Sequence, residues 1–129
     1  MKKLAVILCL ALGALCAQAG DFEDISVDDL DAAIKEGKVT VLDVNGEKSY
    51  KSGHIPGAVH FPSLEDLSKV LPEDKDALIV AYCGGPKCRA YQSGAQAASE
   101  LGYKNVKHLS AGISGWKEAG KETEPVKAE

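Results

Sequence analysis

The segment ALIVAYCGGPKC, residues 77–88, carries the strongest structural signal in this 129-residue chain. Residues 77–82 are apolar throughout, which is typical of a strand buried on both faces of a parallel sheet. The glycine-rich turn that follows leads into a predicted helix over about 89–101, ended by Gly102. Ligands of open parallel sheets bind at the carboxyl ends of the strands. Cys83, directly after this strand, is therefore the first candidate for a functional side chain.

Helical and strand-like patterns alternate along the rest of the chain, which predicts an α/β domain with a mainly parallel sheet. Ser26 and Gly37 mark the two ends of a first helix, and Ser63 and Pro72 bracket a second. The predicted elements are strands over 22–25, 39–44, 58–61, 77–82 and 105–109, helices over 26–37, 63–71, 89–101 and 114–119, a loop over 45–53 and a frayed, charged tail after residue 120.

The N-terminus has the composition of a secretory signal peptide. Two lysines precede an uncharged apolar run, and a small-x-small pattern ends at Ala19. The apolar run is shorter than the roughly 20 residues that span a bilayer. We therefore expect residues 1–19 to be removed, which predicts a periplasmic or secreted protein without membrane attachment; retention of the segment as an anchor is the alternative. Residues 20–129 then form one domain, with a core over about 22–120 and a charged C-terminal tail.

Charge and cysteine content narrow the classes of partner. The net charge is −4 at pH 7 and the chain has no basic run, so nucleic acid and anionic membrane are poor partners. A site for a small anion would have to be locally positive, and the single arginine, Arg89, lies close to Cys83 in sequence. Loss of the leader would leave only Cys83 and Cys88, too few for a disulfide framework. We therefore expect this pair to serve chemistry rather than structure.

Three features of the turn favour a thiolate at Cys83. Gly84 and Gly85 lack a Cβ, so the backbone can turn its N–H groups inward. The predicted helix start adds free N–H donors and the positive end of the helix dipole. Lys87 and Arg89 add cationic side chains. We expect the pKa of Cys83 to lie below the free value of about 8.5, and the same turn to bind an oxyanion. The alternative is a buried, unreactive cysteine at a strand end.

Several segments in a fixed order resemble rhodanese-like domains: VLDVN (41–45) with YKSGHIPGA (50–58), YCGGPKC (82–88), LGYKNV (101–106) and LSAGISGW (109–116). The resemblance implies a three-layer fold, in which helices flank a five-stranded, mainly parallel sheet. It also implies that Cys83 is the catalytic nucleophile and takes sulfur from thiosulfate or a related small anion as a persulfide. Cyanide, a thiol or an acceptor protein would then receive the sulfur, and no metal or organic cofactor would be needed.

The residues expected to hold the sulfur donor around Cys83 are Gly84, Gly85, Lys87, Cys88 and Arg89. The sequence also departs from the usual pattern of these domains. Asn45 stands where arginine is usual, and Ala111 stands where glycine is usual. The active-site loop is about two residues longer than the common form, which resembles a subgroup with a second cysteine in a Cys-x4-Cys loop.

Other functions compete for the same residues. Cys83 to Arg89 also has the Cys-x5-Arg spacing of phosphatases and arsenate reductases, in which the arginine clamps an oxyanion while the cysteine attacks. Against this alternative, no histidine precedes the cysteine, Pro86 stiffens the loop and no carboxylic acid lies nearby in sequence. A second alternative is thiol–disulfide chemistry, in which Cys88 resolves a persulfide on Cys83 and releases sulfide, or else packs at the helix start. A third is a module without catalysis that binds another protein.

The remaining conspicuous side chains favour structural roles. His54, in the GHIPG turn, is expected to hold the loop by hydrogen bonds, and Trp116 is expected to anchor the last helix in the core. His60 and His108 share no metal-ligand spacing with the cysteines, so no metal site is predicted. Asp43, at a strand end, either orients the loop backbone or faces solvent.

Overall fold

The computed structural model describes residues 22–126 of the chain. The predicted signal peptide, residues 1–19 with its cleavage site after Ala19, lies outside the described residues. Within the described range, no helix is long and apolar enough to cross a membrane.

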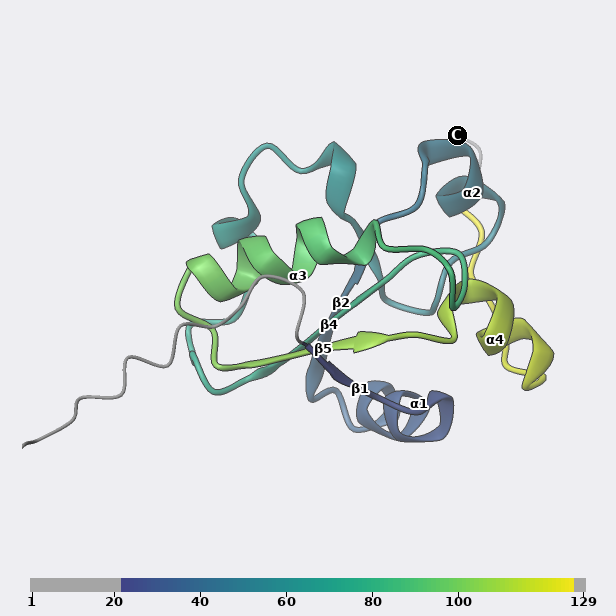
Figure 1. The fold of residues 1–129 in the computed structure, drawn as a ribbon, viewed down its shortest axis with the longest axis horizontal. Helices are drawn as coiled ribbons and strands as arrows, with labels where there is room; N and C mark the ends of the chain where they lie inside the picture. The colour runs from purple at the N-terminus through teal and green to yellow at the C-terminus, as the bar shows by residue number, and fades with distance from the viewer. Residues whose placement is uncertain (1–21, 127–129) are drawn as a thin grey trace, which may run out of the picture.

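Five parallel strands form one sheet in the order β1-β5-β4-β2-β3 (Figure 1). The strands are β1 Glu23–Asp24, β2 Val39–Asp43, β3 Val59–His60, β4 Leu78–Tyr82 and β5 Asn105–Leu109. The predicted five-stranded α/β fold is therefore confirmed, and the apolar segment before Cys83 is the central strand. Because β2 and β5 pair with β4 on either side, Tyr82 lies level with Asp43 and Leu109 at the carboxyl edge of the sheet.

Helices cover both faces of the sheet (Figure 1). The helices α1 Val27–Lys35 and α4 Gly112–Glu118 lie on one side, and α3 Tyr91–Glu100 lies on the other with the 3-10 helices η1 Phe61–Ser63 and η2 Leu67–Lys69. A short helix, α2 Glu47–Ser52, follows β2.

The side chains of β4 divide between two apolar layers with the period of a strand. Val80 and Tyr82 pack in the layer that contains Leu30 and Trp116, under α1 and α4. Ile79 and Ala81 pack in the opposite layer, which contains Ala95 and Ala98 of α3. A strand buried on both faces has no polar alternation, which explains the uninterrupted apolar run. The burial of Trp116 confirms its predicted role as the anchor of the last helix.

Three predictions about connecting segments are wrong. The predicted loop over 45–53 contains α2, a polar helix. An ion pair of 2.6 Å between Lys51 and Glu47, which lie one helical turn apart, stabilises it. The predicted helix over 63–71 is not formed: η1 ends at Ser63, and the single 3-10 turn η2 lies in its place. The Asp66 carboxylate accepts the backbone N–H of Ser68 and starts this turn.

The third wrong prediction concerns the tail, which was expected to be frayed. Glu124 instead exchanges two backbone hydrogen bonds with His54, at 3.0 and 2.8 Å, and the N–H of Val126 donates to the carbonyl of Lys51. Lys121 forms ion pairs with Asp31 and Asp28 of α1, at 2.9 and 3.3 Å. Residues 121–126 are therefore part of the fold, and they hold the loop around α2 in place.

Candidate active site

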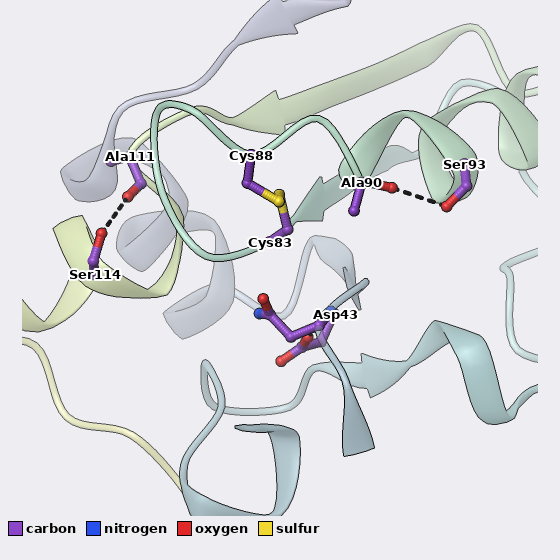
Figure 2. Close-up of a disulfide and its surroundings, with 8 residues drawn as sticks. Asp43, Cys83, Cys88, Ala90, Ser93, Ala111 and Ser114 are labelled. Atoms are coloured by element: carbon purple, nitrogen blue, oxygen red, sulfur yellow. Dashed lines mark hydrogen bonds between the residues drawn. A yellow bond between two sulfur atoms is a disulfide. The ribbon is translucent and has the colours of Figure 1, made fainter. Parts of the chain in front are cut away.

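Cys83 is the first residue after β4, and it begins a loop of residues 83–90, here called the cysteine loop, that ends at α3. Figure 2 shows a disulfide between Cys83 and Cys88 that closes the first part of this loop. The two Cα atoms lie 6.2 Å apart, within the usual range for bonded cysteines. Cys83 is 2% exposed, whereas Cys88 is half-buried. The described chain is thus in an oxidised state in which Cys83 has no free thiol.

The start of α4 packs directly against the cysteine loop. The N–H groups of Ile113 and Ser114 donate to the carbonyls of Cys83 and Gly84, at 2.9 and 3.0 Å. Gly112 makes this contact possible: its φ is +63°, and a Cβ there would lie 2.5 Å from the nitrogen of Gly85. The glycine in the GISGW segment therefore sets the position of the loop from outside it.

A buried hydrogen-bond network supports the edge of the sheet beside Cys83. The Tyr82 hydroxyl donates to Asp43 Oδ2 at 2.5 Å and accepts from the Ile55 N–H at 3.0 Å. Asp43 Oδ1 accepts the N–H of Asn45 at 2.7 Å. Both Asp43 and Tyr82 are almost completely buried, and burial together with the Asp43 contact raises the pKa of Tyr82 above its ordinary value. Of the two roles considered for Asp43, the structure shows the first: it orients backbone near the loop.

A second polar cluster lies around Asn45. His60 Nε2 donates to the Asn45 carbonyl at 2.7 Å, and its Nδ1 pairs with the Ser63 hydroxyl at 2.6 Å. His54 has the structural role predicted for it, because its Nδ1 donates to the Tyr50 carbonyl at 2.9 Å and its ring stacks on the ring of Tyr50. Both histidines are buried and hydrogen-bonded, so they hold the loops beside the sheet edge.

The Asn45 side chain itself has a free donor beside the cysteine loop. Its Oδ1 lies 3.8 Å from the position that a Cβ on Gly84 would occupy, so the amide is adjacent to this loop. Its Nδ2 is buried and has no hydrogen-bond partner among residues 22–126. Buried polar groups are rarely left unpaired, so such a donor marks a place for a ligand atom or a water. Sequence reasoning noted Asn45 only as a departure from arginine; its position after β2 was the available signal.

The other predicted site residues lie along the cysteine loop at different depths. Gly84 and Gly85 are half-buried, while Lys87 and Arg89 are exposed. Among the described residues, no ion pair involves either cation. The N–H groups of Gly84, Gly85 and Lys87 also donate to no acceptor within residues 22–126. The loop therefore offers free N–H donors and unneutralised positive charge on an otherwise acidic chain.

The structure does not gather all of these residues around Cys83. A cavity of about 330 Å³ lies on the Cys88 side of the loop, lined by Pro86, Cys88, Arg89, Tyr91, Gln92, His108 and Ser110. Cys83 and Lys87 are not among its lining residues. The helix after the loop begins at Tyr91 instead of near Arg89, because the loop continues through Ala90. A larger cavity of about 510 Å³ lies at the opposite, amino ends of β2, β4 and β5, and no cysteine lines it.

The fold and the loop together define an α/β domain that carries a cysteine at the carboxyl edge of a parallel sheet. The chain belongs to the rhodanese-like domain family, whose model matches residues 26–119.

Known proteins of several kinds are similar to the chain. It is 30% identical over 101 residues to the thiosulfate sulfurtransferase GlpE of Shewanella oneidensis, covering 76% of this chain and 95% of that protein. It is 37% identical over 84 residues to an HTH-type transcriptional regulator of Mycobacterium tuberculosis, but it spans only 37% of that regulator's length. The crystal structure of the BH2092 protein from Bacillus halodurans superposes with a TM-score of 0.66 at 29% identity, covering 83% of this chain and 82% of that chain.

Proposed function

We propose that the chain is a sulfurtransferase that moves sulfane sulfur from thiosulfate or a related anion to a thiophilic acceptor through a persulfide on Cys83. The observation that carries this proposal is the position of Cys83, which follows the central strand and begins a loop with free N–H groups. Family membership and the similarity to a thiosulfate sulfurtransferase along nearly its whole length support it.

The charges around the loop suit an anionic donor. Lys87 and Arg89 are exposed cations, and the chain as a whole is acidic, so an anion is favoured at this place over the rest of the surface. The N–H groups of Gly84, Gly85 and Lys87 add donors that have no acceptor within residues 22–126. Donors that are already oriented before the anion arrives stabilise its charge without reorganisation.

Sulfur transfer requires the reduced chain, since a disulfide-bonded Cys83 has no thiolate. The Cys83 thiolate attacks the outer sulfur of thiosulfate, and a new S–S bond forms as the bond between the two thiosulfate sulfurs breaks. Sulfite leaves with the electron pair, and the persulfide anion remains on Cys83. An acceptor such as cyanide or a thiol then takes the outer sulfur and regenerates the thiolate.

A phosphatase or arsenate reductase role finds less support. That chemistry needs the Arg89 guanidinium to clamp the same anion that Cys83 attacks, but Arg89 lines the cavity beside Cys88, and Cys83 does not. An anion that the loop N–H groups bind needs only the positive charge of Arg89 nearby. We also propose, from residues 1–19, that the protein works outside the cytoplasm, where two neighbouring cysteines can be oxidised.

Formation of thiocyanate from thiosulfate and cyanide, after reduction of the chain, tests the proposal. The natural chain should turn over, and Cys83→Ala should reduce the rate to that of the solution without protein. Lys48→Ala, which removes an exposed lysine on α2, serves as the matched control and should keep the natural rate. Turnover by the Cys83→Ala chain would refute the persulfide route. Hydrolysis of a phosphate ester, with no thiocyanate formed, would favour the phosphatase alternative.

A further inference from the structure

We infer that Cys88 is a resolving cysteine, which makes the chain a dithiol-dependent thiosulfate reductase as well as a sulfur carrier. In this activity Cys88 expels the outer sulfur of the Cys83 persulfide as sulfide, and the Cys83–Cys88 disulfide of Figure 2 is the product. A dithiol then reduces that disulfide. The inference rests on the proposed function, because it needs the persulfide, but it adds a reaction, a product and a reductant.

The loop holds the two sulfur atoms within bonding reach through contacts that do not involve sulfur. The N–H of Cys88 donates to the carbonyl of Gly85 at 3.0 Å, which closes a turn inside the loop. The carbonyl of Cys83 accepts from Ile113 of α4, and Pro86 restricts the backbone between the cysteines. Because none of these restraints involves a sulfur atom, we expect Cys88 to remain beside Cys83 in the reduced chain and its persulfide.

The two sulfurs differ in access, and this difference assigns their roles. Cys83 is 2% exposed, so a bulky thiol cannot approach it directly in the oxidised chain. Cys88 is half-buried and lines the cavity of about 330 Å³ together with Arg89, His108 and Ser110. A dithiol therefore reaches Cys88 first, and Cys83 is the leaving thiolate.

The resolving step balances without an outside oxidant. The Cys88 thiolate attacks the inner sulfur, Cys83 Sγ, and forms the Cys83–Cys88 bond. The bond between Cys83 Sγ and the outer sulfur breaks, and the outer sulfur leaves with the electron pair as hydrosulfide. The two cysteines lose two electrons, and the sulfane sulfur gains them.

A dithiol closes the cycle. Its first thiolate attacks Cys88 Sγ and releases the Cys83 thiolate, and its second thiol displaces Cys88 from the mixed disulfide. The net reaction converts one thiosulfate and one dithiol into sulfite, hydrogen sulfide and the oxidised dithiol. Cyanide or a simple thiol can still intercept the persulfide before Cys88 does, so the two activities compete for one intermediate.

A single-turnover experiment separates resolution from loading. The full chain, with Cys9→Ser and Cys16→Ser in every sample, is reduced with dithiothreitol, desalted without oxygen and mixed with one equivalent of thiosulfate. Sulfite, sulfide and intact mass are followed together. The chain that keeps Cys88 should give one equivalent each of sulfite and sulfide and end two mass units lighter than its reduced form. The Cys88→Ser chain should give sulfite without sulfide and remain about 32 mass units heavier. Cys88→Ala is the second variant, and circular dichroism checks the fold of each.

The outcomes distinguish the two claims. Sulfite without sulfide from the chain that keeps Cys88 would overturn the resolving role and leave persulfide formation standing. Equal sulfide from this chain and Cys88→Ser would also overturn it, because sulfide would then leave by another route. An absence of sulfite from every chain would refute the transfer to Cys83 itself. Added dithiothreitol should turn the single release of sulfide into continuous turnover. The rate of sulfide release should be at least tenfold higher for the chain that keeps Cys88 than for Cys88→Ser, and equal rates would overturn the resolving role.

Discussion

Replacing Tyr82 by phenylalanine should destabilise the domain by about 2 to 6 kcal/mol. One buried hydroxyl group makes two hydrogen bonds here, donating to Asp43 and accepting from the Ile55 N–H. The substitution removes both bonds and leaves two buried groups without a partner, each of which costs about 1 to 3 kcal/mol. The phenylalanine ring occupies the same space as the tyrosine ring, so the substitution leaves no cavity larger than the lost hydroxyl group. Urea unfolding followed by circular dichroism measures the free energy of unfolding, and its slope with urea should not change.

Tyr50→Phe is the matched control for this prediction. The Tyr50 hydroxyl is half-buried and donates a single hydrogen bond, at 2.8 Å, to the Ala58 carbonyl, so its loss should cost only about 1 kcal/mol. A loss below about 1 kcal/mol for Tyr82→Phe, or equal losses for both variants, would refute the network as a main support of the sheet edge.

The same network predicts a dependence on alkaline pH. Because burial raises the pKa of Tyr82 in the folded chain, the unfolded chain releases its phenolic proton first as pH rises. The stability contributed by this group is complete below about pH 10 and falls above it by about 1.4 kcal/mol per pH unit. Tyr82→Phe should therefore flatten the loss of stability above pH 10.

Three further perturbations follow from the structure. Gly112→Ala should lower the free energy of unfolding by more than about 2 kcal/mol and abolish sulfur transfer, because its φ of +63° and the 2.5 Å approach of a Cβ to loop backbone both disfavour a side chain. Its control is Gly120→Ala, at φ +77° in open space, which should cost only about 1 kcal/mol and keep activity. Urea unfolding and the thiocyanate assay measure the two effects. Hydrogen bonds from Lys35 and Lys121 hold the pKa of Asp31 below its ordinary value. The stability from these contacts is therefore complete above about pH 4 and is lost in stronger acid. When unfolding is measured across an acid titration, Lys121→Met should lose less stability than the natural chain. Arg89→Ala should raise the KM for thiosulfate about threefold to tenfold with little change in unfolding free energy, and an unchanged KM would remove Arg89 from the donor site.

The central strand β4 could be predicted because it is an uninterrupted apolar run, LIVAY, that is too short for a buried helix. The segment before Cys83 is buried on both faces, and this burial is visible in sequence as a lack of polar alternation. The position of Cys83 after the central strand follows from that one assignment.

The supports of the site could not be predicted, because they join residues far apart in the chain. The hydrogen bond from Tyr82 to Asp43 spans 39 positions, and neither residue has a local signal that names the other. The contact of Gly112 with the cysteine loop depends on the crossover that places α4 beside it. The helix α2 has no buried residue and so no apolar periodicity from which to predict it. Proximity of Cys83 and Cys88 in sequence left open whether they bond, and the structure shows the bond.

The most direct test of the central claim is the intact mass of the reduced chain after thiosulfate treatment, in the Cys88→Ser background, where the persulfide should persist. We predict a gain of about 32 mass units that maps to the peptide containing Cys83, disappears on addition of cyanide and is absent from Cys83→Ala. No mass gain in a reduced, folded chain, or a gain that persists in Cys83→Ala, would contradict the assignment of Cys83 as the sulfur carrier.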